Sequence, residues 1–150
     1  MQKVLLISIL IFCQAVQAAD QEADIKINMD IIKEIESSGN PQAYNQTSGA
    51  SGLYQITNIC LNDYNHYHTI QYTKDQLFNP EINYKVADWY INKRIPQLLE
   101  YYNLPDTVKN RLIAYNAGIT KVKAYMLNKK IPQETKNYIK KYFRLLDNIE

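Results

Sequence analysis

Apolar residues recur at helical spacing along most of the chain, and this periodicity restricts the fold more than any other feature. Ile27, Ile31 and Ile35 stand four residues apart, which places them on one face of a helix. Four later segments repeat the pattern, and no stretch alternates apolar and polar residues for long enough to predict a strand with confidence. The pattern predicts a mainly α domain, with at most a small β-hairpin between residues 48 and 56.

Residues with known preferences for helix ends mark the expected boundaries. Asn79, Pro80 and Glu81 combine an N-cap, a proline in the first turn and an early acid, which is typical of a helix start. Pro96 is expected to kink or end that helix, because proline has no N–H to donate. The other expected boundaries are a C-terminal cap at Gly39, N-caps at Asp106 and Thr120, a C-terminal cap at Gly118 and a helix start at Pro132.

The N-terminal segment has the pattern of a secretory signal. A lysine at position 3 precedes an apolar run from Val4 to Cys13, which is too short to span a bilayer. Small residues then lead to a cleavage site after Ala18 or Ala19. We predict a signal peptide over residues 1–18 and one domain over residues 19–150, periplasmic or secreted, with no membrane anchor after cleavage. A buried N-terminal helix is the alternative.

Cleavage would leave Cys60 as the single cysteine, so the fold would have no internal disulfide. Its neighbours are apolar, and we expect a buried, inert thiol; a nucleophilic cysteine would need an activating base nearby. His66 and His68 lie close by in the sequence, but their spacing with Cys60 and Asp63 matches no standard zinc pattern. We therefore expect no metal and no cofactor, and a polar loop at these histidines.

Positive charge is concentrated near the C-terminus. Between Lys109 and Arg144 the sequence has ten lysines or arginines and a single acid, Glu134. A basic face suits an anionic polymer, and cell-wall peptides and nucleic acid both meet that description. A solvated helix face would give the same pattern, so charge alone does not identify a partner.

Glycine is scarce, with four residues in the chain, and their positions indicate two special regions. Gly39, Gly49 and Gly52 follow closely on Glu36, and Gly118 ends the segment Ala114–Gly118. Glycine permits backbone angles and close approaches that other residues do not. Both regions are therefore candidates for a functional site.

Glu36 lies at the C-terminal end of the first predicted helix. The helix dipole is negative there and disfavours a carboxylate, and partial burial against the isoleucine face acts in the same direction. Both effects raise the pKa of the carboxyl, as a general acid at neutral pH requires. By helix position alone, an exposed helix-end acid is the simpler interpretation.

Four sequence motifs follow one another along the chain. The first is Glu36-Ser37 followed by Gly49–Leu53 and Gln55, and the others are Leu77–Asn83, Ala114–Gly118 and the set Pro132, Glu134, Thr135 and Tyr138. In this order they resemble the soluble lytic transglycosylase family of the lysozyme-like superfamily, whose first motif is Glu-Ser, a polar turn and Gly-Ala-x-Gly-Leu-x-Gln. The resemblance covers about residues 25 to 145.

The resemblance implies a lysozyme-like α fold and cleavage of the bond between N-acetylmuramic acid and N-acetylglucosamine. Glu36 would protonate the glycosidic oxygen and then accept the proton of the muramic acid 6-hydroxyl, which closes a 1,6-anhydro ring. Most glycosidases use two carboxylates. Here the substrate supplies the nucleophile, and no second acid accompanies the Glu36 motif.

The resemblance also implies a set of substrate-binding residues. Tyr115 would form a hydrogen bond near Glu36 and help to hold it, and Gln55 and Asn116 would bind acetamido groups. Tyr54 and Tyr138 would offer ring faces for stacking. Tyr54 replaces the usual methionine, and the turn before Gly49 is one residue longer than usual, with Asn45 in the groove.

Other functions are compatible with parts of the pattern. A hydrolase would cut the same bond with water, and a non-catalytic wall-binding or assembly protein could keep the same fold. Nucleic-acid binding through the basic C-terminal helix conflicts with the predicted signal peptide, so we expect none. We expect a monomer acting on the peptidoglycan glycan strand, and the resemblance to small stand-alone members suggests an envelope-spanning secretion or conjugation complex as partner.

Overall fold

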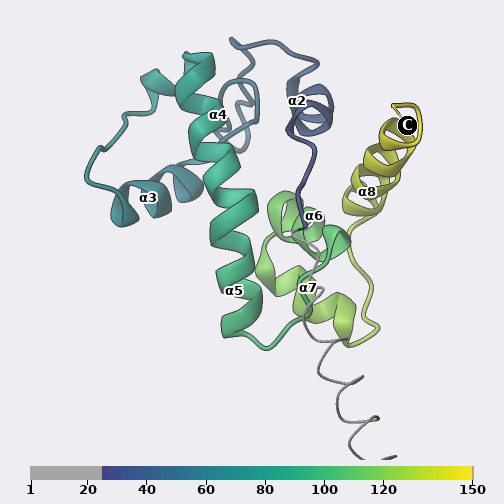
Figure 1. The fold of residues 1–150 in the computed structure, drawn as a ribbon. Helices are drawn as coiled ribbons and strands as arrows, with labels where there is room; N and C mark the ends of the chain where they lie inside the picture. Colours follow the sequence, from purple (N-terminus) through teal and green to yellow (C-terminus); the bar gives the residue numbers. More distant parts are fainter. Residues whose placement is uncertain (1–24, 150) are drawn as a thin grey trace, which may run out of the picture.

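The computed structural model describes residues 25–149, and this part of the chain is mainly helical, which confirms the predicted fold class (Figure 1). The predicted signal peptide and its cleavage site lie outside the described residues. The helices are α2 (Met29–Ser37), α3 (Asn58–Tyr67), α4 (Pro80–Trp89), α5 (Ile95–Tyr101), α6 (Val108–Ala117), α7 (Ile119–Met126) and α8 (Gln133–Leu146), with a 3-10 turn η1 (Asp75–Phe78) and a π turn η2 (Tyr90–Arg94). None of the described helices is long and apolar enough to cross a membrane.

Two isolated β-bridges replace the hairpin considered for residues 48–56. Ser51 pairs with Tyr44 on one side and with Ile56 on the other, and residues 25–149 contain no extended strand. The backbone bends sharply at Gly49, Gly52 and Gln55, all of which have positive φ angles. These bends prevent two strands from running side by side.

The long middle helix continues through Pro96. Helices α4 and α5 form one column in Figure 1, joined by the π turn η2. The N–H of Ile95 donates to the carbonyl of Tyr90, five residues back, just before the proline interrupts the regular pattern. Pro96 therefore does not end the helix, and the irregularity expected there takes the form of a π turn.

The helix start at Asn79 is confirmed, because its side chain accepts from the backbone N–H groups of Glu81 and Ile82. Two other predicted N-caps are wrong. Thr107, not Asp106, caps α6 by accepting from the N–H of Asn110, and the Asp106 carboxylate instead accepts two bonds of 2.7 Å from the Arg111 guanidinium. Thr120 lies inside α7, which begins directly after Gly118.

Helix α3 was not predicted, and it includes His66, where a polar loop was expected. Thr57 caps it, and Cys60, Leu61 and Tyr64 form its buried face. The expected burial of Cys60 is confirmed, and that burial raises the pKa of its thiol far above the usual range. His68 follows the helix and stacks on Tyr64 with ring centroids 3.9 Å apart, which is a packing contact.

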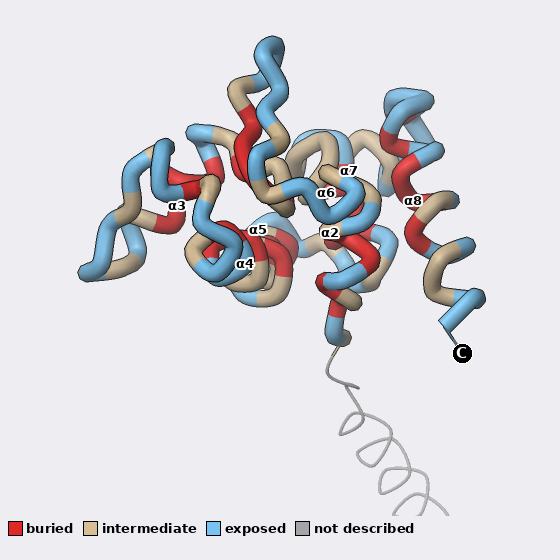
Figure 2. Tube along the Cα trace, turned by 90° about the horizontal axis from the view of Figure 1, so that it is seen from above, coloured by how far each residue is buried: buried red, intermediate tan, exposed pale blue. Residues whose placement is uncertain are grey.

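The core gathers around α6, which contacts α5, α7 and α8, while α2 packs on α8 (Figure 1). Figure 2 shows that the buried segments of α2, α4, α5 and α8 face the interior. Two contacts fix the start of α2: the N–H of Asn28 donates to the Tyr142 hydroxyl at 2.9 Å, and Arg111 donates to the Ile25 carbonyl at 2.6 Å. The start of α2 is thereby tied to α6 and α8.

Candidate active site

A cleft of about 770 Å³ lies where the end of α2, the loop before α3, the end of α6 and one flank of α8 meet. Pockets that bind small ligands usually have volumes of about 300 to 1,000 Å³, and this cleft falls in that range. Of the seven residues predicted for the site, all except Tyr54 line this cleft: Glu36, Asn45, Gln55, Tyr115, Asn116 and Tyr138. Segments from distant parts of the sequence are therefore brought to one place.

Glu36 lies half-buried on the last turn of α2. Burial is the main cause that raises the pKa of its carboxyl from 4.5 to about 7. The negative charge of Glu134 raises it further, while the Tyr138 hydroxyl and the positive charge of Lys141 lower it. At neutral pH this carboxyl is present in both its protonated and its ionised form, so it can donate a proton and also accept one.

The hydroxyl beside Glu36 belongs to Tyr138. It acts on the carboxyl strongly enough to lower the pKa of Glu36, and Glu36 in turn raises that of Tyr138. The same hydroxyl is buried and has no hydrogen bond of standard length and angle to any described residue. Tyr138 lines the cleft but is only 7% exposed, so little of its ring is open for the predicted stacking on a sugar.

Tyr115 and Tyr54 are joined by a hydrogen bond beside the cleft. The Tyr115 hydroxyl donates to the backbone carbonyl of Tyr54 at 2.7 Å and so holds the loop beside Glu36. Burial, and then the charge of Glu36, raise the pKa of Tyr115. The Tyr54 side chain is 3% exposed and packs edge-on against Tyr84. A buried ring cannot stack on a ligand, and the predicted stacking by Tyr54 is therefore wrong.

Glu134 is a cleft residue that the sequence analysis did not assign to the site. It lines the same cavity as Glu36 and comes from the first turn of α8. Its carboxylate is close enough to raise the pKa of Glu36. The last of the four family motifs contains Glu134, and that motif was the signal that could have identified it.

A network of backbone contacts holds the loop of residues 49–55 beside Glu36. Ser37 donates to the carbonyl of Leu53 at 2.8 Å, which ties the residue after the acid to the loop. Asn83 of α4 is fully buried; its amide donates to the carbonyls of Ser51 and Leu77, and its oxygen accepts from the N–H of Tyr54. Asn83 therefore satisfies three buried backbone groups that a loop could not satisfy alone.

Gly52 lies directly against Asn83. With φ at +78°, a Cβ on this residue would lie 2.3 Å from the Leu77 carbonyl oxygen and from the Asn83 amide nitrogen. No side chain fits in that space. Gly52 is thus required for both its backbone angle and its close approach.

The side-chain amides that line the cleft differ in which of their atoms are already hydrogen-bonded to the protein. The Gln55 side chain donates through Nε2 to the carbonyls of Ala43 and Gly52, so its oxygen is oriented as an acceptor. Asn45 uses its side-chain oxygen to accept from the N–H groups of Thr47 and Ser48. Asn116 lines the cleft from the last turn of α6. Together they offer the kind of groups that bind acetamido substituents.

In residues 25–149 no three His, Cys, Asp or Glu side chains come together as they would in a metal site. Glu36 is the acid of the cleft whose pKa is raised to near neutrality. An all-helical domain with a half-buried glutamate facing a polar cleft defines the lysozyme-like class of fold.

Comparison with known families gives the same class and narrows it. The chain belongs to the transglycosylase SLT domain family, whose model matches residues 14–139. This family assignment makes it a peptidoglycan transglycosylase-type enzyme. Searches of curated proteins and of solved structures give no significant match.

Proposed function

We propose that this protein is a lytic transglycosylase that cleaves the β-1,4 bond between N-acetylmuramic acid and N-acetylglucosamine. The observation that carries the proposal is the half-buried Glu36 carboxyl, whose pKa of about 7 lies at the pH where it must act twice. Glu36 protonates the glycosidic oxygen, and the bond to the anomeric carbon breaks. It then accepts the proton of the muramic acid 6-hydroxyl as that oxygen bonds to the anomeric carbon, and no water is consumed.

Neighbouring groups support both steps. The Tyr138 hydroxyl can donate to the Glu36 carboxylate once the proton has been transferred, and the Lys141 charge favours the same ionised form. The Gln55 oxygen can accept from the N–H of an acetamido group, and the Asn116 amide can donate to its carbonyl. These contacts would hold the sugar on the acid side of the cleft.

Hydrolysis of the same bond is the second candidate, and Glu134 favours it. Two carboxylates in one cleft are the usual equipment of a glycosidase, where one can activate water. We prefer the transglycosylase because Glu134 is exposed and its charge adds to the burial that raises the pKa of Glu36, which gives Glu134 a role that requires no water.

Lysis of purified peptidoglycan by matched variants tests the role of Glu36. Glu36→Gln should reduce the lytic rate by about 10² to 10⁴, the usual contribution of a general acid and base. Glu34→Gln, which removes an exposed acid from the same helix, should leave the rate unchanged. Full lysis by Glu36→Gln would contradict the proposal. Wall binding without any lysis by the wild type would identify a non-catalytic binding protein.

We propose further that the protein is exported and acts as a monomer. N-terminal sequencing of the exported protein should begin at Ala19 or Asp20, and sedimentation should give a single species of monomer mass. A protein that keeps Met1 in the cytoplasm would contradict export. An envelope-spanning secretion or conjugation complex remains the proposed partner, to be tested by cross-linking in cells.

A further inference from the structure

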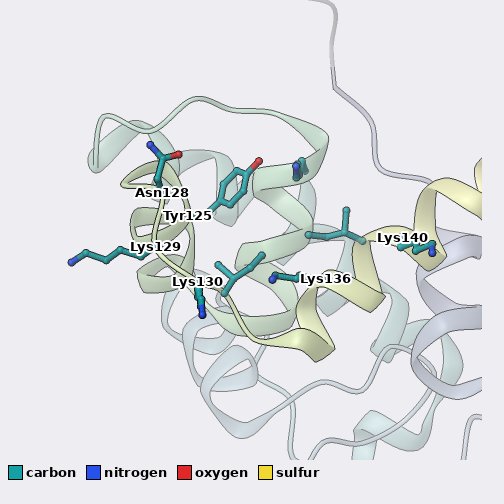
Figure 3. Close-up of a pocket in the computed structure, with 9 residues that line it drawn as sticks. Tyr125, Asn128, Lys129, Lys130, Lys136 and Lys140 are labelled. Carbon is teal, nitrogen blue, oxygen red and sulfur yellow. The ribbon is translucent and has the colours of Figure 1, made fainter.

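A second cavity of about 520 Å³ lies on the side of α8 away from the cleft, between that helix, the end of α7 and the loop that joins them (Figure 3). Five of its nine lining residues are lysines, and none is acidic: Lys109, Lys129, Lys130, Lys136 and Lys140. Half of the ten basic residues between Lys109 and Arg144 are therefore gathered around one hollow.

These lysines have no carboxylate partner among residues 25–149. The ion pairs of the described chain involve Lys33, Arg94 and Arg111, and none involves a lysine of the cavity. The only cation–π contact inside the cavity is that of Lys109, whose Nζ lies 4.7 Å from the centroid of the Tyr125 ring. Several unpaired ammonium groups around one hollow repel each other, and an anionic ligand would relieve that repulsion.

The floor of the cavity is apolar. Ile131 and Ile139 line it at 8% exposure each, and Tyr125 contributes a half-buried ring. The volume falls in the range of pockets that hold small organic ligands. The matching ligand is a short molecule with several anionic groups separated by apolar ones.

The chain builds this cavity with a tight reversal after α7. Asn128 has a φ of 54°, and its N–H donates to the Tyr125 carbonyl while that of Lys129 donates to the Ala124 carbonyl. Figure 3 shows Lys136 extending from α8 toward the side of Tyr125 and Lys130, whereas Lys129 points away from them into solvent. Lys136 is therefore placed to act on a ligand in the cavity, together with Lys109, whose ammonium lies over the Tyr125 ring.

Helix α8 separates the two cavities. Lys136 and Lys140 stand four residues apart on one flank, and Asn137 and Lys141, also four apart, line the cleft on the other. Tyr138 and Ile139 between them are buried. A ligand in the second cavity would therefore not be the segment of glycan that contacts Glu36.

We propose that this second cavity binds the stem peptide of peptidoglycan, on a strand other than the one in the cleft. The choice of polymer rests on the proposed function. A stem peptide has free carboxylates along a short chain and an alanine methyl group near each end, which match the lysines and the isoleucine floor. The protein would then hold the wall at two places, one catalytic and one anchoring.

Two other anionic partners fit less well. A membrane surface would require protruding apolar side chains, but Ile131 and Ile139 form the floor of a hollow. Single-stranded nucleic acid would require free aromatic faces for stacking, but the one aromatic ring of the cavity, Tyr125, already carries the Lys109 ammonium. The stem peptide needs neither feature.

Calorimetric titration of the full mature protein with the free peptide L-alanyl-γ-D-glutamyl-diaminopimelyl-D-alanine tests the proposal. The double variant Lys109→Gln/Lys136→Gln should weaken binding about tenfold, as expected for two exposed charge contacts. The control Lys93→Gln/Lys121→Gln removes the same net charge from positions outside both cavities and should bind like the wild type. The same peptide with its carboxyls amidated should not bind.

Other outcomes would overturn the proposal. The absence of peptide binding, or equal weakening in both double variants, would show that the cavity is not a peptide site. Tighter binding through Lys109 and Lys136 of phosphatidylglycerol vesicles, of an oligonucleotide or of an acidic peptide of ordinary protein residues would assign the cavity to that partner instead. The probe contains no glycosidic bond, so these results do not depend on whether Glu36 is the catalytic acid.

Discussion

Glu36 lies in the last turn of a helix, which is a common position for an acid, but it is also half-buried in a cleft, which is not. A helix end alone leaves a carboxylate hydrated and ionised at neutral pH. Burial in the cleft raises the pKa to about 7, and Glu134, Tyr138 and Lys141 adjust it in opposite directions. The pKa of Glu36 therefore depends in part on α8, which begins almost a hundred residues later.

The pH dependence of lysis should follow the ionisation of Glu36. The first step needs the protonated acid, so kcat/KM should fall tenfold per pH unit above about pH 7. Removing the Glu134 charge by Glu134→Gln should move this decline to lower pH. Removing the hydroxyl that stabilises the carboxylate, by Tyr138→Phe, should move it to higher pH. Shifts in the same direction for both variants would contradict this account of the site.

The same environment should make Glu36 unfavourable for stability. Its folded pKa of about 7 exceeds the ordinary 4.5, so the folded state binds the proton more tightly. The free energy of unfolding should fall as the pH rises from 4.5 to 7, and the difference corresponds to about 3 kcal/mol. Denaturant unfolding at pH 4 and pH 8 should show Glu36→Gln gaining up to about 3 kcal/mol over the wild type at pH 8 alone. An equal gain at both pH values would exclude this cause.

The loop of residues 49–55 depends on helix α4 for its shape. Gly52→Ala should destabilise the protein by about 3 to 4 kcal/mol, because the new methyl group would overlap the Leu77 carbonyl and the Asn83 amide at a positive φ. Gly39→Ala is the matched control: its φ is also positive, but no atom lies within 4 Å of the new Cβ. It should cost about 1 kcal/mol. Equal losses in thermal unfolding would show that only the backbone angle matters.

Helix positions could be predicted from the sequence where a side chain has a local effect. Asn79 with Pro80 marked the start of α4, and Gly118 the end of α6. Helix α3 was missed because Asn62, Asp63 and Asn65 interrupt its apolar pattern, although three of its residues are buried.

Contacts between distant segments could not be predicted in the same way. Nothing local to Asn83 indicates that it clamps a loop thirty residues earlier. Motifs identified Tyr138 and Tyr115 as site residues, but only the packing of α8 and α6 decides which hydroxyl reaches Glu36 and which reaches Tyr54. A motif therefore predicts membership of the site better than the role within it.

At the scale of the whole molecule, α8 organises the surface into two regions of different chemistry. One flank completes the Glu36 cleft with Glu134, Tyr138 and Lys141, and the other carries the lysines of the second cavity. The family assignment makes peptidoglycan the substrate class. A polymer with both sugars and acidic peptides can engage both regions at once.

Mass spectrometry of the products formed from purified peptidoglycan in oxygen-labelled water tests the central claim most directly. If the substrate supplies the nucleophile and Glu36 serves as acid and then base, the released fragments end in 1,6-anhydro-N-acetylmuramic acid and contain no oxygen from the solvent. Fragments with a reducing N-acetylmuramic acid that carries the solvent label would contradict the account and establish hydrolysis by water.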